Sequence, residues 1–301
     1  MSIKKAKKNT IPVSYEQYLH KDDGLALKSL KLVPFFDKIC SKLISIFNEP
    51  IYNIYDQSSK IEITSKQLPK IYKMVEDICR KLGIDIPQVY LSPDRDVDAY
   101  TRGDKKATIT ITSGLLECLK DDEIYAVLAH ECGHIACHHV LYQTMGVFLF
   151  NAGSTGLQTY LGDNLITAAI LKPIELAFYH WMRSSEISAD RAAIICCGNA
   201  DIVVNTMMRL AGGTTAIHKK LNHKAFAQQA QHYDEYIDNS KLNKSLQFLL
   251  TSYNSHPLLA VRAYKATEWA NSPEFLNIIK SMKTQKTNSS RTYPPLNAMR
   301  I

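Results

Sequence analysis

Four histidines and a glutamate gather in one stretch of fifteen residues, AVLAHECGHIACHHV at positions 126–140. His130 and His134 are four residues apart, so on a helix their imidazoles lie on successive turns of one face and can bind one metal ion. Glu131, between them in sequence, can reach a water on that ion without being a ligand. Two neutral nitrogen ligands and a carboxylate base are what metal-assisted hydrolysis requires, so the spacing predicts a hydrolytic metal centre.

The two remaining histidines are not expected to bind the same ion. On a continuous helix His138 lies roughly 12 Å along the axis from His130, and His139 points to the opposite side. We interpret both as interfacial or solvated side chains. A third histidine ten residues after the first completes some sites of this kind, but Val140 occupies that position here.

A catalytic zinc needs a third protein ligand and one open position for water. The segment SSEISADRAA, at 184–193, offers Glu186 and Asp190 four residues apart on one helical face. Glu186 can complete the ligand set, and Asp190 can accept the free ring N–H of a ligating histidine and fix its tautomer. Taken alone, this spacing is also typical of a solvated helix face.

LAHECGHI together with SSEISADRAA resembles the HtpX-like and CAAX-prenyl-protease type of zinc metallopeptidase, a gluzincin group whose second helix carries a Glu-x-x-x-Asp-Arg-x-Ala signature. The similarity continues upstream through DAYTRGDKKATITITSGLLECL and downstream to His256-Pro257 and Arg262, and it covers roughly residues 61–265. The interval between the two signature helices holds no strong membrane span, as in the soluble or peripheral branch. The resemblance implies an α+β, mostly helical fold, with a zincin-like metallopeptidase domain and a small sheet whose edge strand binds substrate.

The resemblance also implies a zinc-dependent endopeptidase that acts on extended or unfolded proteins or peptides. Glu131 is then the general base, Asp190 supports a ligand from behind, and His256 is the candidate for stabilising the oxyanion. The implied ligands of a single Zn2+ per chain are His130, His134 and Glu186.

Substrate contacts are expected from Asp98, Ala99, Thr110 and Arg262. The strand Ala107–Thr112 is expected to present an edge to which an extended substrate adds as a further strand, with an ordinary paired strand as the open alternative. Related proteins usually have asparagine before Ala-Phe or Ala-Tyr, where this chain has Asp98. Because an ionised carboxylate cannot donate the hydrogen bond of an amide, we expect Asp98 to accept one from the substrate.

Two other classes of function remain open. One is a zinc-binding scaffold or chaperone without peptidase activity, which only Asp98 favours. The other is a membrane-embedded protease. Residues 140–162 carry no charge and are long enough to span a bilayer, but polar residues and four glycines dilute them. We therefore prefer a helix packed on its own domain, with peripheral membrane contact as the alternative.

The sequence divides into a leader with a helical extension at 1–60, the metallopeptidase domain at 61–270, and a helix end with a polar tail at 271–301. The segment KQLPKIYKMVEDICRKLG, at 66–83, predicts an amphipathic helix that stops at Gly83. The buried face of that helix is expected to consist of Leu68, Ile71, Val75, Ile78, Cys79 and Leu82.

PQVYLS and ATITITSG predict two strands, the second half-exposed because isoleucine and threonine alternate. The acidic residues 121–123 suit the start of the helix that bears the histidines, because a helix N-terminus favours negative charge. Further helices are expected at 26–47 with a break at Pro34, at 165–211 with a break at Pro173, and briefly after Pro273.

The net charge of +7 does not indicate a nucleic-acid-binding protein. Nine of the 36 basic residues lie beyond the first and last acidic residues, and the remaining 27 nearly balance the 29 acidic ones.

Seven cysteines in a long chain favour a reducing compartment over a disulfide scaffold. No apolar run follows the N-terminal lysines, so we expect a cytoplasmic protein without a signal peptide. The oligomeric state is not indicated.

Overall fold

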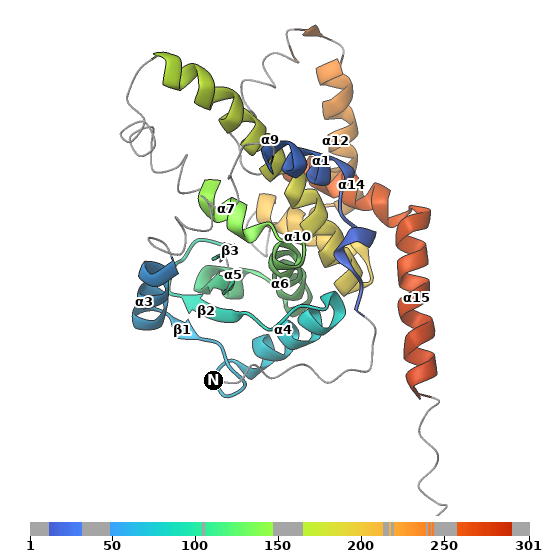
Figure 1. Ribbon diagram of the computed structural model, residues 1–301. Coiled ribbons are helices and arrows are strands. Elements are labelled where there is room, and N and C mark those ends of the chain that lie inside the picture. The colour runs from blue at the N-terminus through green and yellow to red at the C-terminus, as the bar shows by residue number, and fades with distance from the viewer. Residues whose placement is uncertain are drawn as a thin grey trace, which may run out of the picture.

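The computed structural model describes residues 12–31, 49–103, 106–146, 165–212, 217, 220–238, 240–241, 243 and 258–290. The fold is α+β and mostly helical, as predicted (Figure 1). Its elements are η1 (Tyr15–Gln17), α1 (Lys21–Lys31), α3 (Glu49–Ser59), β1 (Ile61–Glu62), α4 (Pro69–Leu82), β2 (Gln88–Ser92), β3 (Ala99–Arg102), β4 (Thr108–Thr112), α5 (Ser113–Cys118), α6 (Asp121–Ala136), α7 (Val140–Gly146), α9 (Leu165–Cys197), α10 (Ala200–Gly212), α12 (His223–Asp238), α14 (Leu259–Ala270) and α15 (Pro273–Ser290).

The sheet has four strands in the order β1-β2-β4-β3. β2 and β4 are parallel, and the two outer pairs are antiparallel. Both strands predicted from the sequence are present as β2 and β4. The edge expected at Ala107–Thr112 lies elsewhere, however, because β4 is paired on both sides. β3, at the end of the sheet, lies against the helix that bears the histidines.

β4 is also not half-exposed as expected, since all five of its residues are buried. The isoleucines face the main core, and a second layer covers the threonines. Lys60 supplies part of that layer: its ammonium donates to Thr110 Oγ1 at 3.0 Å and pairs with Asp56 at 2.6 Å. The alternation of residue types is real, but the central position of the strand buries both of its faces.

α6 lies between the sheet and the later helices α9 and α10 (Figure 1). It begins where the acidic residues predict, and the Glu123 carboxylate accepts the backbone N–H of Lys120 at 2.8 Å. Gly133 allows α9 to approach closely, because a Cβ at this position would lie 2.7 Å from the Cβ of Ala192 and 3.1 Å from the Cα of Ala189. The close contact of the two signature helices therefore depends on a residue without a side chain.

α4 confirms the predicted amphipathic helix and its stop. Gly83 adopts a left-handed conformation with φ of 73° and donates its N–H to Cys79 O at 2.8 Å. Leu68 was wrongly assigned to the buried face: it is 37% exposed and has φ of 55°. It precedes Pro69, whose ring disfavours the right-handed helical conformation in the residue before it.

The break predicted at Pro173 is also wrong, because α9 continues through it as one helix. A proline inside a helix removes one backbone hydrogen bond and can bend the helix without ending it. The helix after Pro273 is longer than expected, and Pro34 lies outside the described residues. Among the described residues no helix is long and apolar enough to cross a membrane. The uncharged stretch at 140–162 is described only to residue 146, in α7.

The N-terminal segment packs on the domain. Val13 donates its backbone N–H to Lys81 O at 2.9 Å, and Tyr18 is buried with 1% exposure. α1 lies against α9, as Figure 1 shows. Residues 12–31 are therefore part of the folded body next to the second signature helix.

Candidate active site

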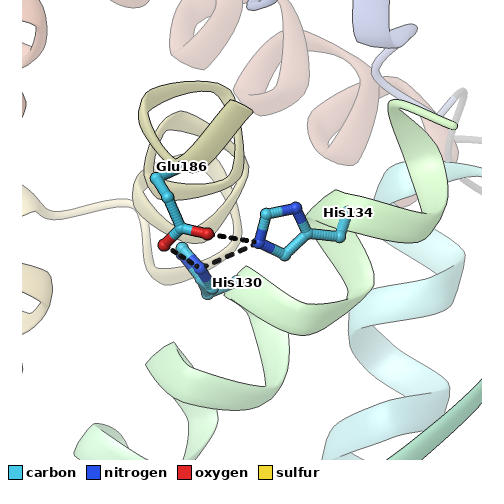
Figure 2. A group of neighbouring side chains, drawn as sticks. All are labelled: His130, His134 and Glu186. Carbon is cyan, nitrogen blue, oxygen red and sulfur yellow. Dashed lines mark hydrogen bonds and ion pairs between the residues drawn. The ribbon is translucent and has the colours of Figure 1, made fainter. Parts of the chain in front are cut away.

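Two helices bring the three predicted metal ligands together. His130 and His134 project from successive turns of α6, and Glu186 faces them from α9 (Figure 2). The ligand atoms of the three side chains all lie within 4.8 Å of one another. His134 and Glu186 are buried, with 3% and 2% exposure.

The spacing of these atoms suits a tetrahedral metal ion. The two Nε2 atoms are 3.1 Å apart, His130 Nε2 lies 3.4 Å from Glu186 Oε2, and His134 Nε2 lies 3.3 Å from Glu186 Oε1. Ligands bound tetrahedrally at zinc–nitrogen and zinc–oxygen bond lengths are about 3.3 Å apart. Two imidazoles and one carboxylate also form the donor set of catalytic zinc sites. The residues therefore fit a zinc ion by donor type and by separation.

Asp190, the second carboxylate of α9, orients the His130 ring through the nitrogen that faces away from the ligand cluster. Asp190 Oδ1 accepts a hydrogen bond from His130 Nδ1 at 2.9 Å, which leaves Nε2 directed at the ligand cluster. Burial lowers the pKa of His130, but the hydrogen bonds to Asp190 and Glu186 outweigh burial and raise it to about 10. The two carboxylates thus create a field that favours positive charge at the site.

Arg262, from α14, joins the same carboxylates. Its guanidinium donates to both oxygens of Asp190, from Nε at 2.8 Å and from Nη2 at 2.6 Å, and its Nη1 lies 2.9 Å from Glu186 Oε2. Arg262 is 9% exposed. Its charge is therefore directed at the two carboxylates of α9, although the sequence placed it among the substrate contacts.

We expect Asp190→Ala to weaken zinc binding about 10–100-fold, because His130 loses the acceptor that orients its ring. Competition with a chromogenic chelator measures the affinity. Asp190→Asn is the matched control, since its amide oxygen can still accept from His130 Nδ1, and it should retain more of the affinity. Wild-type zinc affinity in Asp190→Ala would show that this hydrogen bond does not support the metal.

Glu131 lies beside the ligands and is held by the sheet. The hydroxyl of Thr101, on β3, donates to Glu131 Oε2 at 2.6 Å. Burial raises the pKa of Glu131 to about 7, although His130 and the Thr101 hydrogen bond act in the opposite direction. A carboxylate with a pKa near neutrality is well matched to general-base catalysis.

Thr101→Val is expected to lower kcat roughly tenfold or more, since a hydrogen bond to a charged group contributes about 1.5–3 kcal/mol. Valine has nearly the same shape but cannot donate to Glu131. Thr101→Ser keeps the hydroxyl and should keep most of the activity. Zinc content should stay unchanged in both variants, and an unchanged kcat in Thr101→Val would refute the assignment.

The remaining predicted residues lie at different distances from this cluster. Asp98 is exposed next to β3, and its Oδ1 accepts the N–H of Ala99 at 2.9 Å. Its charge raises the pKa of Glu131, so it lies within electrostatic reach of the base. Thr110 is fully buried under Lys60, away from any edge. His256 lies outside the described residues.

Sequence reasoning missed three polar partners of the cluster. Thr101 could not be found, because its position depends on the pairing of β3 with β4. His139 was placed on a continuous helix, but α6 ends at Ala136 and His138 has φ of 59°. This turn leaves His138 exposed and directs His139 into the interior, where its Nδ1 lies 3.0 Å from His134 Nδ1. The third partner, Asp23, contacts His139 and comes from α1.

Two histidines and a glutamate from two packed helices, with a buried glutamate beside the first histidine, define a metallopeptidase of the His-Glu-x-x-His type. The chain belongs to peptidase family M48, whose family model matches residues 65–270. It is 30% identical over 274 residues to the plastoglobule-localized metallopeptidase 48, chloroplastic, of Arabidopsis thaliana, an alignment that covers 90% of this chain and 77% of that protein.

Two bacterial relatives support the same assignment. A protease HtpX homolog of Trichormus variabilis is 28% identical over 222 residues, which cover 66% of this chain and 73% of the relative. A protease HtpX homolog of a Sulfurihydrogenibium species is 29% identical over 171 residues, which cover 50% of this chain and 58% of the relative. No solved structure shows a significant match to this chain.

Proposed function

We propose that this protein is a zinc endopeptidase that cleaves extended or unfolded polypeptides. The observation that carries the proposal is the cluster of His130, His134 and Glu186, with ligand atoms 3.1–3.4 Å apart and Glu131 beside it. The membership in family M48 supports the same chemistry.

A zinc ion held by His130, His134 and Glu186 would supply a Lewis acid, which would lower the pKa of a bound water and polarise the scissile carbonyl. Glu131 accepts the proton of the attacking water at a carboxylate oxygen and then passes it to the leaving nitrogen. Thr101 holds that carboxylate in place. We assign Arg262 to positioning Glu186 and Asp190, and we retain His256 as the candidate that stabilises the oxyanion, on the basis of its His-Pro element.

The substrate is proposed to lie along β3. Among the described strands β3 pairs only with β4, and Thr101 in its middle contacts the proposed base. An extended peptide that pairs with Ala99 and its neighbours would place a carbonyl close to Glu131. Recognition would then rest on main-chain hydrogen bonds, which favours unfolded substrates over any one side chain.

Digestion of unfolded casein tests this function. We expect fragments that disappear on treatment with a chelator and return when zinc is added, with a folded, disulfide-linked protein as the uncut control. A purified protein that contains zinc but leaves casein intact would favour the alternative of a zinc-binding scaffold. Cleavage that persists without zinc would contradict the proposal.

Asp98→Asn examines the position where the family that the chain resembles usually has asparagine before Ala-Phe or Ala-Tyr. If Asp98 accepts a hydrogen bond from the substrate, the change should leave kcat/KM flat or lower it by up to about tenfold. An unstructured peptide substrate gives the measurement. A clear gain in kcat/KM would instead show that this position should donate a hydrogen bond.

A further inference from the structure

We propose that the N-terminal helix α1 completes the metal centre, with Asp23 acting through His139 as a positioning residue for the ligand His134. The inference rests on the proposed zinc site. It assigns a role to a segment that lies outside the part of the chain matched by the family model, residues 65–270.

Asp23 is a buried carboxylate with a complete set of donors. It lies in the first turn of α1, where the helix dipole favours negative charge, and it has 0% exposure. Its Oδ2 accepts from Ser188 Oγ at 2.6 Å and lies 2.9 Å from His139 Nε2, and its Oδ1 accepts from Trp181 Nε1 at 3.0 Å. Burial raises the pKa of Asp23, but these hydrogen bonds and His139 outweigh it and keep the pKa below its ordinary value.

His139 connects this carboxylate to the metal ligand. It is fully buried, and its two ring nitrogens face two different partners: Nε2 faces Asp23, and Nδ1 lies 3.0 Å from His134 Nδ1. His134 in turn directs its Nε2 at Glu186 and His130. The chain of contacts therefore runs without interruption from α1 to the ligand cluster.

One assignment of the ring hydrogens lets His139 serve as the hydrogen-bond acceptor of His134. His134 must offer an unprotonated Nε2 to a metal, so its ring hydrogen is on Nδ1. That hydrogen needs an acceptor, which His139 Nδ1 provides if His139 carries its own hydrogen on Nε2. The ionised Asp23 accepts only, and therefore fixes the hydrogen of His139 on Nε2. Asp23 thus selects the tautomer of His134 through one intervening side chain, His139.

A second polar group lies near the same nitrogen. The side-chain amide of Gln143, on α7, has its Nε2 3.0 Å from His134 Nδ1 and 3.5 Å from Ser185 Oγ. An amide can also present its oxygen and serve as the acceptor in place of His139. Gln143 is therefore the rival partner of His134 that an experiment must separate from His139.

The arrangement couples the folding of the N-terminal segment to metal binding. A partner behind a ligating histidine typically changes metal affinity 10–100-fold. Because linkage is reciprocal, zinc should stabilise the docking of α1 by the same factor by which docked α1 strengthens zinc binding. The same bonds also hold α1 on α9, since Trp181 and Ser188 belong to α9.

Zinc affinity of the full-length chain, measured by competition with a chelator, tests the proposal. We expect His139→Phe to weaken binding about 10–100-fold and Asp23→Asn about tenfold. Leu27→Ala is the matched control: it loosens the contact of the same helix with the apolar cluster that includes Phe178 and Trp181, and it leaves the side chains of Asp23 and His139 unchanged. It should lower the thermal midpoint while changing zinc affinity by less than about twofold.

Gln143→Met addresses the rival partner, and it should change zinc affinity less than His139→Phe does. The reverse order would assign the acceptor to Gln143 and overturn the proposal. Equal losses of affinity in Leu27→Ala and Asp23→Asn would also overturn it, because the effect would then follow from docking alone. Wild-type affinity in both His139→Phe and Asp23→Asn would contradict it directly.

The histidine NMR spectrum of the zinc-loaded wild-type chain gives a test that needs no variant. With 15N-labelled histidine we expect His134 to carry its hydrogen on Nδ1 and His139 on Nε2. A hydrogen on Nδ1 of His139 would exclude it as the acceptor and refute the proposal. A wild-type chain that binds no zinc at all would instead refute the proposed function, so the two failures are distinguishable.

Discussion

Glu131→Gln is expected to lower the kcat of peptide hydrolysis by roughly 10²–10⁴-fold, the usual contribution of general acid–base catalysis. Glutamine has the same shape, and its amide oxygen can still accept the hydrogen bond that Thr101 donates to Glu131. It cannot take a proton from water. The variant should therefore keep its fold and its zinc while it loses turnover.

The Glu131→Gln measurement pairs turnover with metal analysis on one preparation. Glu268→Gln, on the exposed side of α14, is a control for the amide substitution itself and should retain full activity. Loss of zinc in Glu131→Gln would show that Glu131 is a ligand. Near-normal turnover would show that another group acts as the base.

Glu186→Ala is expected to abolish stoichiometric zinc binding. It removes the one ligand supplied by α9 and leaves two histidines, too few protein ligands for a stable catalytic site. It also removes a partner of Arg262, which then retains Asp190. After dialysis the zinc content should fall from about one ion per chain to near zero, and casein cleavage should fall with it.

The matched comparison for Glu186→Ala is Asp190→Ala, since both remove a buried carboxylate of α9 that binds Arg262. Asp190 contacts His130 Nδ1, so its loss should weaken zinc binding without abolishing it. Full zinc content in Glu186→Ala, together with complete loss of zinc in Asp190→Ala, would show that Asp190 is the third ligand and Glu186 is not.

The prediction of the first signature helix holds because it depends on local spacing. The helix that bears His130 and His134 follows from a four-residue interval and an acidic start, and both are properties of one helix. Placing Glu186 opposite them required the resemblance to known metallopeptidases. The number of residues between His134 and Glu186 does not predict that α6 and α9 pack closely. Their close contact is possible because Gly133 has no side chain.

Several failures share a physical cause, which is that a pattern along the chain does not determine what packs against it. β4 alternates like a half-exposed strand, yet its central position in the sheet buries both faces. Thr101 becomes a partner of Glu131 only through the pairing of β3 with β4. We placed His139 on the side of a continuous helix that faces away from the metal ligands. The helix in fact ends three residues earlier, at Ala136.

Titration of zinc back into the metal-free chain, with zinc content and casein cleavage measured on the same samples, tests the central claim most directly. We predict that activity rises in proportion to bound zinc and saturates at about one ion per chain. The Glu131→Gln variant should take up the same single ion and stay inactive. Activity before any zinc is bound, or a wild-type chain that fills its site and cleaves nothing, would contradict the account.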